Sequence, residues 1–270
     1  MLTRIITFYC FCDDLLKAIE YGDDKQVEMT TAEVMTVAFV AAEFFGGCFE
    51  KARWMLMEHG YIKRMLSKSR FNRRLHQIPE MVWRQLGYVL GEANKHLNPT
   101  QEYIVDSIPV PVCDNIRISR SRLYQGEEYR GKIASKHRYF YGLRIHLVVT
   151  ATGEPVEFEL APGSVADIRA FKSFDLDLPE GATAYADKAY TDYLWEDLLA
   201  EVQDIDLIAL RKSNAKRVMD GCIRYICQHV RKRIENSFSQ IAERFARFIR
   251  AVTPRCFELK CFLFVWSFAI

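Results

Sequence analysis

The chain has 270 residues, 50% of them hydrophobic, and a formal net charge of +2. It is long enough to bury the core of one large domain or of two smaller ones. Its eight cysteines include no Cys-x-x-Cys pair and no histidine at zinc-finger spacing, so we expect reduced thiols rather than a zinc finger. The apolar run at 261–270 is too short to span a bilayer and no secretory signal is convincing, so we expect a soluble cytoplasmic protein without a membrane partner.

Charge is distributed unevenly along the chain. Residues 153–210 contain fourteen acidic and three basic side chains, a net charge of −11, whereas residues 211–255 contain twelve basic and three acidic ones, a net charge of +9. Residues 117–138 form a second basic block with a net charge of +5. An acidic block between two basic ones suits a metal-dependent nuclease, because carboxylates hold cations and basic groups hold phosphates. The alternative is that each run is only a solvated surface.

Residues 1–98 show helical patterns and no strand alternation. Thr30 and Glu33 have the spacing of a capping box in front of an apolar run that ends at Gly46. Further helices are expected near 49–58, 67–76 and 80–96. Basic residues on this bundle suggest a helix-turn-helix-like DNA reader: Arg64, Lys68, Arg70, Arg73 and Arg74. The alternative is a solvated basic face on a bundle that serves as a lid or a dimer contact.

After Pro99 the pattern changes to short runs with strand character. Strands are expected at 103–105, 139–150, 155–161, 183–186 and 206–210. Ser164 and Asp167 are expected to cap a helix that runs to Phe174. Further helices are expected at 192–202 and 228–250. This order of elements predicts a mixed α+β or α/β sheet flanked by helices, preceded by a small all-helical N-terminal domain.

Two aspartates follow apolar strand segments directly. Asp106 comes after 103–105, and Asp187 comes after 183–186. If those strands are neighbours, the two carboxylates meet, and such a pair is stable only with cations between them or with a shared proton. Taken alone, each aspartate has an alternative role as a turn or capping residue.

A third acid, Glu235, lies on the long helix expected near the end of the chain. An apolar stripe with helical spacing predicts which side of that helix is buried, and small residues at 239, 242 and 246 run beside it with Glu235. Small residues let the helix approach the sheet closely, so Glu235 is expected to point toward the two aspartates. The alternative is an exposed glutamate that pairs with Arg231, four residues earlier.

Three carboxylates suit phosphodiester chemistry. Two Mg²⁺ ions about 3.5–4 Å apart activate the attacking oxygen and relieve charge on the leaving oxygen, and carboxylates are the hard oxygen ligands that Mg²⁺ prefers. Lys132 and Lys188 are candidates for positioning the scissile phosphate. Further candidates for contacts with the DNA backbone are Lys136, Arg138, Arg211, Lys212, Arg231, Lys232 and Arg233. Each single basic residue has an alternative reading as an ordinary surface charge.

Taken together and in this order, the motifs resemble bacterial insertion-sequence transposases with a DDE triad on a ribonuclease-H-like fold. The resemblance rests on IVDSIPVPVC around Asp106, YFYGLRIHLVVTATGEPVEFELAPGSVAD, YADKAYTDY around Asp187, and RKRIENSFSQI around Glu235. It covers the chain from about residue 103 to its end and is weaker in the helical N-terminal part. Asp106, Asp187 and Glu235 match the three acids of the triad. The short interval before Glu235 leaves no room for the large insertion domain of some relatives.

Three positions depart from the family pattern. Arg231 fits the Arg-x-x-x-Glu part of a signature of related groups, but Gln228 stands where those have Tyr and Ala242 where they have Lys. Ala166 precedes Asp167 where many relatives have His. The phosphate contacts that the family makes from those positions are therefore not expected here.

The resemblance implies two domains, a helical one at 1–98 for DNA binding or dimerisation and a catalytic one at 99–270. It also implies two Mg²⁺ ions per active site, replaceable by Mn²⁺, and cleavage of element ends followed by strand transfer into target DNA. The implied partners are double-stranded DNA, as terminal inverted repeats and as target, and a second copy of the chain on paired ends, near the nucleoid. Two alternatives remain, a stand-alone nuclease of the same fold and an inactive DNA-binding relic.

Overall fold

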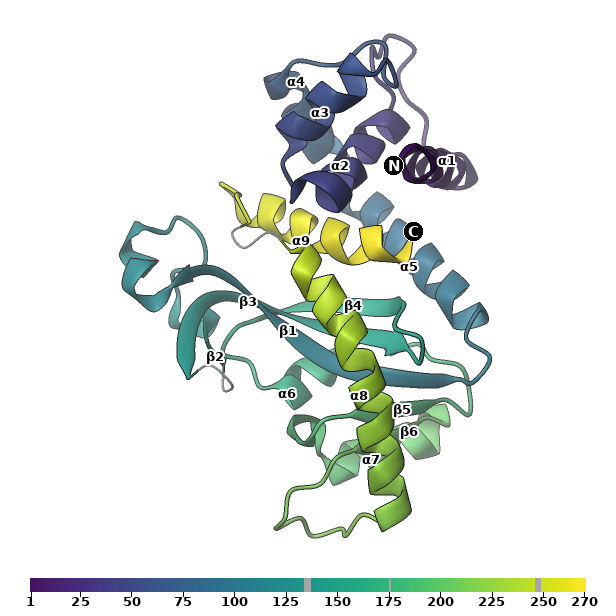
Figure 1. The fold of residues 1–270 in the computed structure, drawn as a ribbon, viewed down its shortest axis with the longest axis vertical. Coiled ribbons are helices and arrows are strands. Elements are labelled where there is room, and N and C mark those ends of the chain that lie inside the picture. The colour runs from purple at the N-terminus through teal and green to yellow at the C-terminus, as the bar shows by residue number, and fades with distance from the viewer. Residues whose placement is uncertain (134–136, 175, 246–248) are drawn as a thin grey trace. The chain divides into compact units, whose positions relative to one another are not determined.

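The computed structural model of the chain describes residues 1–133, 137–174, 176–245 and 249–270. Within these ranges, side chains are described for all residues except 115, 233–238, 242 and 244. The chain forms two compact units, one made of Met1–Leu90 and Glu243–Ile270, the other of Gly91–Ala242. Figure 1 shows the ribbon.

The first unit is helical. Its helices are α1 (Leu2–Ala18), α2 (Thr31–Phe45), α3 (Phe49–Glu58), α4 (Lys68–Gln77), the first part of α5 (Glu80–His96) and α9 (Pro254–Ala269). Helix α2 forms the centre of this unit, because most of its side chains are buried on every side. Thr30 and Glu33 form both hydrogen bonds of the predicted capping box, and Gly46 ends α2 in the left-handed conformation.

Helix α9 packs against α2 in this unit. A Cβ atom added to Gly47 would lie 3.1 Å from the ring of Phe264, so the chain after α2 approaches α9 closely. The sequence led us to expect residues 99–270 in one domain, but residues 243–270 form part of the helical unit. Their apolar side chains, including Phe257, Phe264 and Trp266, are buried there.

No single helix among the described residues is long and apolar enough to span a membrane. Helices α2 and α3 pass that test only as a pair, and they are bent by 107° relative to each other.

The second unit contains a six-stranded mixed sheet with the order β2-β3-β1-β5-β6, and β4 also pairs with β3. Its strands are β1 (Glu102–Asp114), β2 (Arg130–Ile133), β3 (Arg138–Thr150), β4 (Pro155–Pro162), β5 (Thr183–Ala186) and β6 (Asp206–Ala209). Its helices are α6 (Asp167–Phe171), α7 (Tyr193–Gln203), α8 (Gly221–Arg244, which extends past the unit's end at 242), and the short 3₁₀ helices η1 (Asn115–Arg120), η2 (Glu127–Tyr129) and η4 (Lys188–Tyr190).

Antiparallel pairs join β1, β3 and β4, whereas β5 and β6 run parallel to β1. Strand β3 pairs with β2 along its first residues and with β4 along the rest. This mixed sheet flanked by helices confirms the predicted ribonuclease-H-like fold class. Strands β5 and β6 are parallel because α7 carries the chain back between them, whereas antiparallel neighbours need only a short turn.

One face of the sheet holds a buried apolar core. Alternate residues of three neighbouring strands contribute to it, among them Val105, Ala186 and Ala209. Phe171 of α6 and Leu199 of α7 pack on the same cluster. Ala186 and Ala209, on the short strands β5 and β6, are small and leave space for these larger side chains. Helices α6 and α7 therefore cover this face.

Helix α8 crosses the opposite face of the sheet (Figure 1). The sulfur of Cys227 lies 3.7 Å from the carbonyl oxygen of Ile208 on β6, which places this side of α8 against the strands. The helix spans Gly221–Arg244, so it begins seven residues before the expected start at 228 and ends before the expected 250. Asp220 explains the earlier start, because its carboxylate accepts the backbone N–H of Cys222 in the first turn.

Two further expectations are corrected. Asp106 was expected just after a three-residue strand, but β1 continues past it to Asp114 because β3 pairs with the whole length. Ser164 and Asp167 were expected to cap a helix together. Instead, α6 has no side-chain cap: the Ser164 hydroxyl donates to the carbonyl of Glu128, and the Asp167 carboxylate accepts bonds from β1 and β3.

Candidate active site

Asp106 and Asp187 lie on neighbouring strands at the same level of the sheet. Val105 of β1 and Ala186 of β5 are the last paired residues of this parallel ladder. Each aspartate is the next residue on its chain. Strand β5 ends there, so Asp187 lies at the carboxyl edge, while β1 carries Asp106 onward beside β3, opposite Leu147. The predicted juxtaposition of the two acids is therefore present, although only one of them ends its strand.

Backbone amides orient both carboxylates. The N–H of Ser107 donates to Oδ1 of Asp106 at 2.8 Å. Asp187 is the N-cap of η4, and its Oδ1 accepts the N–H of Ala189. Each aspartate uses one oxygen for its own chain in this way. This leaves Oδ2 of Asp187 available to another partner, whereas Oδ2 of Asp106 already lies 3.5 Å from Nη2 of Arg231.

The environment of Asp106 is strongly shaped by burial. Burial raises the pKa of this carboxyl, and the nearby carboxylates of Asp187 and Asp167 raise it further. The Ser107 N–H and the guanidinium of Arg231 act in the opposite direction and lower the pKa. The Asp106 side chain is 34% exposed, and the three carboxylates here face two guanidinium groups, those of Arg231 and Arg144. A bound cation would relieve the remaining negative charge.

Arg231 of α8 reaches this site from the helix that crosses the sheet. Its Nη2 lies 3.5 Å from Oδ2 of Asp106, and its side chain is only 18% exposed. We expected Arg231 to contact DNA backbone or Glu235, and the structure places its guanidinium beside the first acid instead. Glu235 follows Arg231 by one helical turn on α8, so its backbone lies on the same side of the helix. The Glu235 side chain lies outside those described, as does that of Arg233.

A polar network next to Asp106 was not foreseen from the sequence. The hydroxyl of Ser107 donates to Oδ1 of Asp167 at 2.9 Å. Nη1 of Arg144 lies 3.3 Å from the same oxygen and 3.2 Å from the Ser107 hydroxyl. These contacts connect α6 and β3 to the residue that follows Asp106 on β1. The sequence signal that could have indicated this network is Arg144, a charged residue in the mostly apolar strand segment 139–150. A charge in such a strand needs a partner inside the protein.

Tyr190 and His146 extend this network into the core. Nδ1 of His146 lies 3.4 Å from the hydroxyl of Tyr190, and His146 is fully buried on β3, opposite Ser107. Burial lowers the pKa of His146 to about 4, so this histidine is neutral at pH 7. Burial and the carboxylates of Asp167 and Asp106 raise the pKa of Tyr190 well above its usual value. Both groups therefore serve as neutral hydrogen-bonding groups behind the acids.

The predicted basic residues of the sheet unit are found in different settings. Lys188 follows Asp187 directly and is exposed, and Lys132 on β2 is exposed with its Nζ 5.9 Å from the ring centre of Tyr139. Arg138 pairs with Asp114, and Arg211 pairs with Glu196 at 2.6 Å, so these two are neutralised inside the unit. Lys212 and Lys232 are exposed, and Lys136 lies outside the described residues.

The predicted basic cluster of the helical unit is partly neutralised as well. Nη2 of Arg74 lies 2.8 Å from Oδ1 of Asp23, and Nη1 of Arg70 lies 3.3 Å from Oε2 of Glu28. Arg64 and Arg73 are exposed. Lys68, at the start of α4, lines a cavity. No continuous basic helix face is therefore formed by these five residues.

Among the described side chains, no three His, Cys, Asp or Glu residues lie close enough together to hold a metal ion as a group. Glu235 is not among those side chains, so this finding leaves the predicted triad with two described members. Asp106 and Asp187 provide carboxylate oxygens, the ligands that suit Mg²⁺ and Mn²⁺.

Comparison with known proteins gives one family. The family described as "Transposase DDE domain" matches residues 96–246, which is more than half of the chain and contains β1 to β6 and α8. Neither the comparison with curated proteins nor that with solved structures gave a match. The match begins before β1 and ends just after α8, so it contains the two aspartates on adjacent strands and the helix that carries Arg231 and Glu235. The chain belongs to the transposase DDE domain family.

Proposed function

We propose that this chain cleaves the ends of a mobile DNA element and transfers the strands into target DNA. The observation that supports this best is the parallel register of β1 and β5, which brings Asp106 and Asp187 together inside the DDE domain. Family membership gives a transposase that acts on DNA. The register supports our assignment of the first two acids of its triad to Asp106 and Asp187.

The donor groups at this site fit divalent cations. Asp106 is a partly buried acid with two acidic neighbours, and the backbone hydrogen bond of Asp187 leaves Oδ2 of that residue available. A cation at Asp106 would share its Oδ2 with Arg231. We assign Asp106, Asp187 and Glu235 as the ligands of two Mg²⁺ ions, with Mn²⁺ able to replace them. When bound, two such ions supply an activated oxygen nucleophile and charge relief on the leaving oxygen.

The residues of the chain itself hold and orient the reactants. Arg231 holds the Asp106 carboxylate from α8, and Ser107 fixes the other oxygen of the same group. Lys188, exposed beside Asp187, and Lys132 on β2 are assigned to the scissile phosphate, because an exposed ammonium neutralises phosphate charge without a fixed geometry. No side chain forms a covalent bond to DNA in this proposal.

The substrate in this proposal is double-stranded DNA, first as the terminal inverted repeats of the element and then as the target. Two ends must be joined in concert, so we propose that two copies of the chain act together. Chromosomal DNA as substrate places the protein in the cytoplasm at the nucleoid.

The test is incubation of the purified chain with Mg²⁺ and a labelled duplex that carries the ends of its own element, with products resolved on a denaturing gel. The Asp187→Asn variant is compared with Asp197→Asn, which removes an acid of α7 that pairs with Arg217 at the surface. Nicking and joining by the native chain and by Asp197→Asn, but not by Asp187→Asn, are expected.

Other products distinguish the alternatives. Nicks without any joined product would show a stand-alone nuclease. Binding without any product, in Mg²⁺ and also in Mn²⁺, would contradict the enzymatic proposal and leave a DNA-binding relic.

A further inference from the structure

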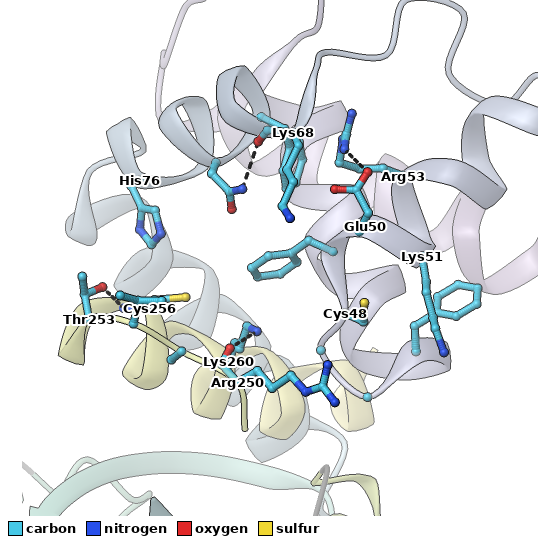
Figure 2. A pocket seen from close by; sticks show the side chains of 18 residues that line it. Cys48, Glu50, Lys51, Arg53, Lys68, His76, Arg250, Thr253, Cys256 and Lys260 are labelled. Carbon is cyan, nitrogen blue, oxygen red and sulfur yellow. Dashed lines mark hydrogen bonds and ion pairs between the residues drawn. The ribbon is translucent and has the colours of Figure 1, made fainter. Parts of the chain in front are cut away.

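The helical unit contains a cavity of about 810 Å³ between α3, α4 and the start of α9. All its lining residues belong to the helical unit, at 45–53, 68–76 and 250–260. Figure 2 shows Lys68 extending from α4 toward the middle of this cavity, with Arg250 and Lys260 on the opposite side. A cavity of this size is in the range of roughly 300–1,000 Å³ that small ligands occupy.

The charges around the cavity are almost all positive. Five lysines and arginines line it, together with one carboxylate, and the residues are Lys51, Arg53, Lys68, Arg250, Lys260 and Glu50. Glu50 is already engaged, because its Oε1 lies 2.6 Å from Nη1 of Arg53. In the described part of the chain, no carboxylate pairs with the other four cations. An anion is therefore the ligand that this charge pattern favours.

Lys260 is the most unusual of these cations. It is 7% exposed, and its Nζ donates to the carbonyl oxygen of Arg250 at 2.6 Å and lies 4.8 Å from the ring centre of Phe49. An ammonium has three donors, so two remain for another partner. Burial lowers the pKa of Lys260, which is the cost of holding a charge there without a carboxylate.

A second sign of positive potential comes from His76, which also lines the cavity. Burial lowers the pKa of His76, and the charges of Arg255 and Lys260 lower it further. The start of α9 lies at the same wall, since Thr253, its N-cap, and Cys256 both line the cavity. This helix start offers few amides to a ligand, because Pro254 has no N–H and Thr253 accepts the N–H groups of Cys256 and Phe257. The side-chain cations therefore carry the positive potential of the cavity.

Phosphate fits this cavity better than a carboxylate ligand. Four separate cations arranged around one space suit a group with several charged oxygens, whereas a single carboxylate is satisfied by one or two donors. On α4, Arg70 and Arg74 are held by acids and Arg73 is exposed away from the cavity, whereas Lys68 faces it. Four cations without an acidic partner among the described residues are thus brought around one concave site.

We propose that this cavity binds a phosphodiester of a DNA strand, with Lys51, Lys68, Arg250 and Lys260 as its cationic contacts. The choice of DNA as the source of the phosphate rests on the proposed function. A duplex is too wide to enter the cavity as a whole, so one or two phosphates of one strand occupy it while the rest of the DNA lies outside.

The test is DNA binding by the full chain without divalent metal, measured by fluorescence anisotropy at several salt concentrations. The probe is a labelled oligodeoxynucleotide, used as a single strand and as a duplex. The test variant combines Lys51→Gln, Lys68→Gln and Arg250→Gln, three exposed residues whose replacement leaves the buried core intact. The matched control is Lys25→Gln, an exposed lysine of the same unit that does not line this cavity.

We expect the triple variant to bind at least one form of the probe about tenfold more weakly, with a salt dependence lower by about one to two phosphate contacts, and Lys25→Gln to bind as the native chain does. Equal affinity and an equal salt slope for the triple variant would overturn the proposal. Competition with inorganic phosphate and with deoxyadenosine monophosphate shows whether the phosphate that the cavity binds belongs to DNA or to a small molecule. Displacement of the oligonucleotide at micromolar concentrations of either would overturn the assignment to DNA.

This outcome is independent of the cleavage reaction, because no metal is present. A chain that cleaves nothing but loses binding in the triple variant would contradict the proposed function and support the cavity. If the native chain cleaves DNA and the triple variant binds DNA as the native chain does, the proposed function is supported and the cavity proposal is contradicted.

Discussion

The two charged regions of the molecule have opposite chemistry. The site on the sheet gathers carboxylates around Asp106 with two arginines beside them, and the cavity of the helical unit gathers cations around Lys260 with one engaged carboxylate. In the first region backbone register determines which groups meet, since the pairing of β1 with β5 brings Asp106 beside Asp187. In the helical unit, the packing of α3, α4 and α9 leaves a cavity lined by basic side chains.

In our two proposals, one polyanion is bound by two kinds of site. An acidic site interacts with phosphates only through bound cations, so its affinity for DNA depends on metal. A basic cavity binds phosphate directly, so its affinity depends on salt instead. Changes in the two regions are therefore expected to separate cleavage from binding.

The largest expected effect comes from the third acid. Glu235→Gln removes a charged ligand from the site and is expected to lower strand cleavage by about 10²–10³-fold or more while DNA binding without metal is retained. The measurement is the gel assay of element-end cleavage. Glu243→Gln, an exposed position two turns further on the same helix, is the matched control. Full activity of Glu235→Gln would remove Glu235 from the site and leave two assigned acids.

A smaller loss is expected from the network behind the acids. Asp167→Asn weakens the charge-assisted contact with Arg144 and alters the support of Ser107, so cleavage is expected to fall about 10–100-fold. The Mg²⁺ concentration that gives half-maximal cleavage is expected to rise, a shift that simple destabilisation does not cause. Unchanged metal dependence, with activity lost only in proportion to folded protein, would give Asp167 a structural role alone.

The fold of the sheet unit depends on a close approach at Gly142. A Cβ atom there would lie 2.4 Å from the carbonyl oxygen of Val110, at the bulge where β1 and β3 shift register. Gly142→Ala is expected to lower the free energy of unfolding by about 1–3 kcal/mol. Gly22→Ala, where an added Cβ meets nothing within 4 Å, is the control, and urea unfolding of both variants makes the comparison. Equal stability of the two variants would mean that the strands separate there without cost.

The smallest effect is expected in the helical unit. Thr30→Ala removes the hydroxyl that accepts the N–H of Glu33 at the start of α2, which is expected to cost about 1 kcal/mol of stability. Thermal unfolding gives the value, and Thr7→Ala, an exposed position of α1 whose hydroxyl donates to the carbonyl of Thr3, is the control. Loss of cleavage at temperatures where Thr30→Ala is fully folded would contradict a purely structural role for this cap.

Local signals allowed much of the fold to be predicted. The capping box at Thr30 and Glu33, the helix at 80–96 and the strand near 139–150 follow from caps and periodicity, which act between neighbouring residues. Helix α9 was not foreseen as a separate helix of the N-terminal unit. This helix has no distinct polar face, so its sequence does not indicate which side is buried. Tertiary packing alone decides that it lies against α2.

At the site, the positions of the two aspartates were predictable in the same way, from local sequence. Asp106 and Asp187 each follow an apolar segment, and the family resemblance supplied their pairing. The contacts of Asp167 with Ser107 and Arg144 join residues 23 to 60 positions apart, and no local pattern encodes them. Arg231 likewise lies 125 positions from Asp106. Such contacts follow from strand register and from the path of α8 across the sheet.

The measurement that tests the central claim most directly is metal rescue of Asp187→Cys in the cleavage assay. A thiolate is a softer ligand than a carboxylate, so a site that holds a catalytic ion through residue 187 prefers softer metals after this change. The account predicts no cleavage by Asp187→Cys in Mg²⁺ and recovered cleavage in Mn²⁺ or Zn²⁺, with Asp197→Cys active in Mg²⁺ throughout. Full cleavage by Asp187→Cys in Mg²⁺ would contradict the assignment of Asp187 as a metal ligand and with it the proposed active site.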